Sequence, residues 1–281
     1  MKNTFFLLFL SFLSCNTGDL KVIADLPDSL REVSGLEVDE NNNVLWMVND
    51  SGNKPILYGL NPNGTIITQL KLKAKNRDWE DLTMDPIGNV YIGNFGNNAN
   101  DSKGLTILKI SKDSLNASGK IGVDKINFVY PEQTKFPPKK KDRHFDCEAF
   151  FFYQDSLYLF TKSRSSEEKR KTNLYQLPAK AGNYNAKLIG SFNVYSENKY
   201  MITSADINDV GDLVVLLTED NVVLFSDFKD NSFLNGHVEY FPFDHDSQKE
   251  SVSFKNDSTL YIADEYVGIH GGNLYEFRLK K

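Results

Sequence analysis

Cysteine and histidine are scarce in this sequence of 281 residues. It holds two cysteines and four histidines. No two histidines stand at metal-ligand spacing, and Cys147 has no second thiol near it in the chain. These absences exclude a disulfide-stapled scaffold and argue against a zinc- or copper-type centre. Cys147 stands inside the apolar run Phe145–Phe151, so we expect a buried structural thiol rather than a nucleophile.

The sequence also lacks a basic stripe. Its 32 Lys and Arg residues are outnumbered by 38 Asp and Glu residues, which gives a net charge of −6 spread along the chain. A nucleic-acid partner requires clustered cations that displace counterions from the phosphates. The composition therefore argues against nucleic acid, and we interpret the run Lys139–Lys141 as a solvated loop.

No apolar run is long enough to span a bilayer. The one compact run, Phe5–Leu10, follows Lys2 and is typical of a signal-peptide core. The small residue before Cys15 resembles a bacterial lipobox, and that resemblance implies lipidation of Cys15. An ordinary signal peptide with an incidental cysteine is the alternative. We expect a signal peptide at 1–14, a lipidated linker at 15–19 and a folded domain at 20–281, anchored in a bacterial cell envelope at its periplasmic or outer-membrane face.

One structural unit recurs five times along the chain. Each copy has a short strand that begins near an acidic residue, a turn rich in Asn, Asp, Gly or Pro, and a strongly apolar second strand. A third strand follows in every copy, and a fourth follows in four of them. The paired first and second strands span residues 34–50, 80–94, 148–162, 205–219 and 250–265.

This repeat predicts an all-β fold, a single β-propeller of five four-stranded blades. The fifth copy ends before a fourth strand, and residues 20–26 supply a spare one. We therefore expect the N-terminal strand to complete the last blade and close the ring. A linear β-solenoid would not need this exchange. Six blades are the alternative count, because the stretch from Asn97 to Asp146 is long; we interpret its excess length as a loop insertion.

Acidic and amide side chains recur where the first strands begin and the second strands end. Antiparallel strands bring these positions to one face of a propeller, at the mouth of its central channel. Crowded carboxylates raise each other's pKa and require a compensating cation, basic partners or water. The same residue types also cap turns and strand ends, which is the structural alternative.

Oxygen-rich sites without histidine suit calcium, which takes six to eight oxygen ligands. We therefore predict a Ca²⁺ site at the mouth. The expected metal ligands are Asp78, Glu80, Asp146, Glu148, Asp206 and Glu250. The expected residues for a further ligand are Asp50, Asn94, Asn97, Lys162, Arg164, Glu219 and Glu265.

Several short segments carry a family resemblance: Arg31–Leu36, Val48–Gly52, Asp78–Leu82, Gly93–Asn98, Asp146–Phe150 with Thr161–Ser163, Thr203–Ile207 and Ala263–Glu265. Together they resemble propellers of the SdiA-regulated and esterase-like phytase type, over nearly the whole mature chain. Such a family implies secreted or membrane-attached propellers with a metal-compatible acidic face, and some members hydrolyse phosphate esters. Phosphate chemistry of that kind needs several basic residues, whereas this mouth offers mainly Lys162 and Arg164, with Arg77 and Arg143 nearby.

Two functions fit these residues. The first is a binding module of the cell envelope, with a small molecule, glycan or protein as ligand and a monomeric propeller. The alternative is a metal-dependent hydrolase of phosphate or carboxylic esters, in which calcium polarises the ester. No nucleophile elbow, phosphate-binding loop or zinc-protease helix is present. The catalytic residues and the enzyme question therefore stay open.

Overall fold

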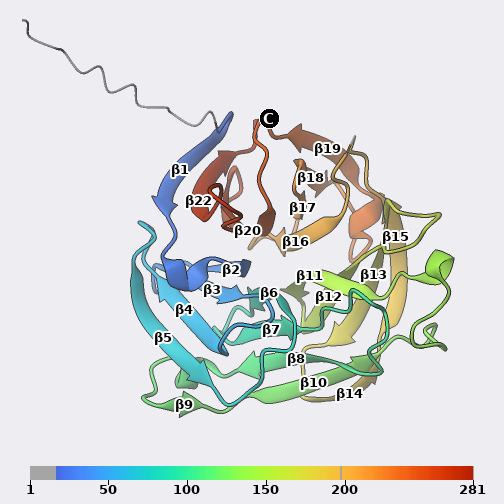
Figure 1. Cartoon of the computed structure of the whole chain (residues 1–281), viewed down its shortest axis with the longest axis horizontal. Helices are drawn as coiled ribbons and strands as arrows, with labels where there is room; N and C mark the ends of the chain where they lie inside the picture. The colour runs from blue at the N-terminus through green and yellow to red at the C-terminus, as the bar shows by residue number, and fades with distance from the viewer. Residues whose placement is uncertain (1–16, 197, 281) are drawn as a thin grey trace, which may run out of the picture.

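The computed structural model describes residues 17–196 and 198–280. Cys15 and the expected signal peptide lie outside these residues. The described chain forms five β-sheets arranged as blades around a central axis, as the ring in Figure 1 shows. The prediction of a five-bladed β-propeller is confirmed. No helix in the described part is long and apolar enough to cross a bilayer.

Each blade is an antiparallel sheet whose first strand lies innermost. Blade 1 holds β2 (Val33–Asp39), β3 (Val44–Asn49), β4 (Ile56–Leu60) and β5 (Ile66–Leu72). Blade 2 holds β6 (Trp79–Met84), β7 (Val90–Asn94), β8 (Leu105–Ile110) and β10 (Asp124–Val129). Blade 3 holds β11 (Asp146–Tyr153), β12 (Ser156–Lys162), β13 (Lys171–Pro178) and β15 (Lys187–Asn193). Blade 4 holds β16 (Ile202–Ile207), β17 (Val214–Thr218), β18 (Asn221–Ser226) and β19 (His237–Pro242).

The last blade joins the two ends of the chain. It holds β20 (Lys249–Asn256), β21 (Thr259–Asp264), β22 (Asn273–Arg278) and the N-terminal strand β1 (Leu20–Asp25). Strand β1 pairs antiparallel with β22, from Leu20 opposite Phe277 to Asp25 opposite Asn273. The expected closure of the ring by the N-terminal strand is therefore confirmed, and it leaves β22 without a free edge.

Two short strands cross from one blade to the next. β9 (Lys120–Ile121) leaves blade 2 and pairs in parallel with β5, and β14 (Gly182–Asn185) leaves blade 3 and pairs in parallel with β10. The segment between β8 and β10 thus pairs first with the neighbouring sheet, before β10 completes blade 2. The remaining short elements are 3₁₀ turns, η1 (Asp28–Leu30), η2 (Lys112–Ser114), η3 (Lys140–Asp142) and η4 (Phe233–Asn235).

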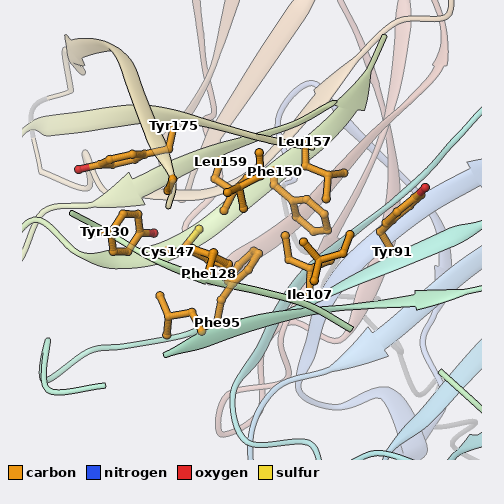
Figure 2. Close-up of a cluster of buried hydrophobic side chains, with 14 of the residues drawn as sticks. Tyr91, Phe95, Ile107, Phe128, Tyr130, Cys147, Phe150, Leu157, Leu159 and Tyr175 are labelled. Atoms are coloured by element: carbon orange, nitrogen blue, oxygen red, sulfur yellow. The ribbon is translucent and has the colours of Figure 1, made fainter. Parts of the chain in front are cut away.

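Apolar residues of alternate strand positions fill the space between neighbouring blades. Figure 2 shows the cluster between blades 2 and 3, where Cys147 lies close to Phe128, Tyr130 and Phe150. Cys147 is fully buried and forms no disulfide, and burial raises the pKa of its thiol. The expectation that Cys147 is buried is confirmed, and a thiol that resists ionisation is a poor nucleophile.

Polar side chains of the inner strands join the blades. The Asp206 carboxylate accepts a hydrogen bond from the Phe254 N–H at 2.7 Å, and the Thr83 hydroxyl accepts one from the Phe152 N–H at 3.2 Å. Asp81 is fully buried and accepts hydrogen bonds from the N–H groups of Phe150 and Ala205. Asp81 therefore links blades 2, 3 and 4 across the channel, below the mouth.

Candidate functional site

A β-bulge lies near the start of the inner strand in every blade. In each blade the pairing with the second strand skips at least one residue, for example between Cys147 and Ala149. An extra residue bends the strand and redirects its side chain. The skipped residues are Ser34, Glu80 with Asp81, Glu148, Thr203 and Glu250. Three of the predicted metal ligands thus stand at equivalent bulges.

The bulges and the ends of the second strands meet at one face, as the sequence predicts. In the strand register, Asp146 lies opposite Lys162, and Lys249 lies opposite Asp264. We call the resulting polar surface at the channel opening the mouth. It is formed by Asp50, Asp78, Glu80, Asp146, Glu148, Lys162, Arg164, Glu250 and Glu265.

Asp50, Asp78 and Glu80 form a cluster that we call the acidic trio. Each offers a carboxylate oxygen, and these oxygens lie within 4.8 Å of one another. Within the described residues, none of the three forms an ion pair with a Lys, Arg or His side chain. The trio joins the end of β3 in blade 1 to the start of β6 in blade 2.

The trio gathers three carboxylates that no ion pair in the described chain neutralises. Burial raises the pKa of Asp78 to about 6, and the Asp50 carboxylate adds to that effect. Burial also raises the pKa of Glu80 well above its usual range, together with Glu148 and Asp50. Carboxyls with such raised pKa values gain from a bound cation, because the cation replaces the protons that they otherwise hold.

Gly96 lets the backbone approach the trio closely. A Cβ atom at this position would clash with the Glu80 Oε1 and the Asp78 Oδ2. The loop after β7 therefore passes the two carboxylates with bare backbone, which only glycine permits. The hard oxygen donors of the trio suit a calcium ion.

Asp146 and Glu148 are neutralised by basic partners, unlike the trio. Lys162 Nζ lies 3.0 Å from Glu148 Oε2, and Arg164 Nε lies 2.6 Å from Asp146 Oδ2. Arg164 Nη2 also lies 3.3 Å from Glu148 Oε1. Burial opposes the charge of Lys162, yet the Glu148 carboxylate raises its pKa above the usual value. These four side chains form a closed network, so neither cation is a free anion clamp.

Arg164 is held in place by the loop before β11. Its N–H donates to the Arg143 carbonyl at 2.9 Å, and Ser165 Oγ donates to the Lys141 carbonyl at 2.6 Å. His144 Nδ1 lies 3.0 Å from Ser163 Oγ. Ser163 is only 2% exposed, so His144 and Ser163 position this loop rather than attack a substrate.

Two further carboxyls with raised pKa values complete the mouth. Burial raises the pKa of Glu250 to about 7, where Lys162 opposes the shift and Glu148 adds to it. Burial, with Glu250 and Asp50, raises the pKa of Glu265 to about 8. Glu265 accepts a hydrogen bond from Gln248 Nε2 at 2.7 Å.

The other predicted residues have different roles. The Asn94 side chain accepts hydrogen bonds from the N–H groups of Arg77 and Asp78, and so shapes the loop that carries the trio. Asn97 is buried; its N–H donates to Asp146 Oδ1 at 2.7 Å, and its side chain donates to a backbone carbonyl. Glu219 pairs with Lys199 at 2.7 Å.

Asp206 does not join the mouth. Its carboxylate lies deeper in the channel, where it accepts hydrogen bonds from Ile207 and Phe254. Burial raises the pKa of Glu37, and the Asp206 carboxylate adds to that effect. The sequence predicts Asp206 at the start of an inner strand, because other repeats carry an acidic residue at the equivalent position. In fact β16 begins at Ile202, and Thr203 occupies the bulge.

Comparisons with known proteins support the fold. No family model matches the chain, and no curated protein matches its sequence. A solved gluconolactonase from Xanthomonas campestris is 12% identical with a TM-score of 0.53, and the match covers 93% of this chain and 89% of that one. A virginiamycin B lyase from Staphylococcus aureus is 13% identical with a TM-score of 0.44, over 91% and 69%. The chain is therefore a β-propeller similar in fold to a solved gluconolactonase.

Proposed function

We propose that this protein is a cell-envelope binding module whose mouth holds a calcium ion on Asp50, Asp78 and Glu80. The observation that carries the proposal is the convergence within 4.8 Å of three carboxylates that form no ion pair among the described residues. Their resemblance to the acidic segments of SdiA-regulated and phytase-type propellers supports it. A bound cation would supply positive charge and open coordination positions for the oxygen atoms of a ligand.

The charges of the residues around the trio determine which ligand the mouth can bind. Lys162 and Arg164 are engaged by Asp146 and Glu148, so the wall of blade 3 carries little free positive charge. Glu250 and Glu265 line the opposite side with raised pKa values. This mixture of donors and acceptors suits a hydroxyl- or carbonyl-rich ligand better than a phosphate cluster.

Calorimetry tests the cation site directly. We expect the chain without its first 15 residues to bind calcium saturably, and the variants Asp78→Asn and Glu80→Gln to lose that binding while their circular dichroism is unchanged. Asp101→Asn removes an exposed carboxylate elsewhere on blade 2 and serves as the control. Calcium binding that survives in both trio variants, or that is absent from the parent chain, would refute the site.

Metal-dependent ester hydrolysis is the second candidate. Glu250, with a pKa of about 7, can accept a proton near neutral pH beside Glu148 and Lys162. A solved gluconolactonase has a similar fold. The substrates to assay are therefore a lactone and a phosphomonoester. Calcium-dependent turnover that is lost in Glu250→Gln would favour the enzyme over the binding module.

We also propose that Cys15 carries a lipid that attaches the propeller to the envelope. The short apolar segment and the small residue before Cys15 support this proposal. Full-length protein should partition into detergent, and the Cys15→Ser variant should remain in the aqueous phase.

A further inference from the structure

A groove of about 1250 Å³ lies between blades 1 and 2, outside the mouth. It is bounded by β5, β8, β9, β10 and the connection from β5 to β6. Single small molecules usually occupy pockets of roughly 300–1,000 Å³. The groove is therefore large enough for an extended ligand.

Basic residues dominate the lining of this groove, although the whole chain is acidic. Seven of the 32 Lys and Arg residues line it, and no Asp or Glu does. All seven are exposed, and none forms an ion pair within the described residues. They are Arg77 and the lysines Lys54, Lys71, Lys73, Lys75, Lys120 and Lys125.

We propose that this groove binds an extended anionic sugar chain that carries carboxylate or phosphate groups. The cations come from both blades, so they match repeated anionic groups along a chain rather than one anion. Amide and hydroxyl side chains between them, such as Gln69, Asn94 and Thr106, can hydrogen-bond to sugar hydroxyls.

Other polyanions fit the groove less well. Its lining has no aromatic side chain on which nucleic-acid bases could stack. The end of β5 at Lys71 and Leu72 already pairs with β9, so an acidic peptide cannot add there as a further strand. A concave groove between blades also does not match the flat surface of an anionic membrane.

The groove adjoins the loop that carries the acidic trio. Arg77 lines the groove, while its neighbour Asp78 belongs to the trio. Asn94 lines the groove and accepts hydrogen bonds from the N–H groups of both residues. The sugar chain is bound by the groove itself, whether or not the mouth holds a cation.

Fluorescence anisotropy with labelled oligogalacturonate, and separately with a phosphorylated dextran fragment, tests the proposal in the presence of EDTA. We expect at least one probe to bind and its affinity to fall as salt is raised, because exposed charges are screened. The triple variant Lys71→Gln, Lys73→Gln, Lys125→Gln should bind about tenfold more weakly or worse at low ionic strength.

The matched control is the triple change of Lys139, Lys140 and Lys141 to Gln. It removes the same charge from an exposed loop away from the groove and should leave affinity within about twofold. Equal weakening in both triples, or no binding of either sugar probe, would overturn the proposal. So would equal or tighter binding of poly-glutamate, single-stranded DNA or phosphatidylglycerol vesicles. Because EDTA is present throughout, failure here does not bear on the calcium site, which the calorimetry tests separately.

Discussion

At the scale of single residues, the mouth contains two kinds of carboxylate. Asp146 and Glu148 have their countercharges built into blade 3, within 3.3 Å. Asp50, Asp78 and Glu80 have none within the described chain. Removing one partner from a buried ion pair leaves an unpaired charge, which is costly. The first pair therefore serves the stability of the fold, whereas the trio is free to exchange a proton for a cation.

Gly96→Ala tests the close approach of the backbone to the trio. The added Cβ would meet the far ends of the Asp78 and Glu80 side chains, which can move without displacing the backbone. We expect normal folding and calcium affinity that falls at least about tenfold, because the two carboxylates no longer converge. Gly104→Ala, where a Cβ would meet nothing within 4 Å, is the control. Equal calcium affinity in both variants would contradict this geometry.

The position of most mouth residues follows from the sequence, because hairpin pairing brings strand starts and strand ends together. Asp78, Glu80 and Glu250 could be read from their repeat positions. The pairing of Lys162 and Arg164 could not, since it depends on side-chain direction after a bulge. The depth of Asp206 could not be read from its repeat position, because the blade 4 bulge holds Thr203 and no carboxylate.

At the scale of elements, β1 is the strand that the last blade borrows from the other end of the chain. Leu20 is 2% exposed and packs in the core between blades 4 and 5, while Val22 on the same strand is 44% exposed. The sequence predicted this strand because the fifth repeat has no fourth strand of its own. It did not predict β9 and β14, which pair in parallel with the preceding blade. These strands have four residues or fewer, too few to show a hydrophobic periodicity in the sequence.

Leu20→Ala should destabilise the whole propeller. The substitution removes buried methyl groups and leaves a cavity, which costs about 2–5 kcal/mol in the free energy of unfolding. Denaturant unfolding followed by tryptophan fluorescence measures this loss. Val22→Ala is the control on the same strand and should cost under about 1 kcal/mol. Similar small losses in both variants would mean that β1 is not required to close the ring.

At the scale of the whole molecule, the acidic mouth makes stability depend on pH. The pKa of Glu265 is raised to about 8 by burial, Glu250, Asp50 and Glu32, against the attraction of Lys162. The folded state thus binds this proton more tightly than the unfolded chain does. Below the ordinary pKa of glutamate both states hold the proton, and the difference vanishes. Folding becomes progressively less favourable as the pH rises from that value towards about 8.

In EDTA, we therefore expect the melting temperature to fall by a few degrees between pH 5 and pH 8. Glu265→Gln should reduce that fall and melt above the parent chain at pH 8, because it carries no charge to desolvate. Scanning calorimetry measures both. Asp113→Asn changes an exposed carboxylate and should follow the parent chain. A parent melting temperature that rises over this range, or a Glu265→Gln profile identical to it, would contradict the assignment.

The direction of β1 has a consequence for how the protein can be displayed. Leu20 pairs with Phe277 near the turn that joins β20 to β21, where Leu279 also donates to the Ser258 carbonyl. Asp25, at the other end of β1, pairs with Asn273 beside Asp264, on the side of the mouth. Both described ends of the chain thus emerge from the face opposite the mouth. A lipid, a tag or a sensor chip attached at either end would leave the acidic opening pointing outward, towards whatever diffuses past.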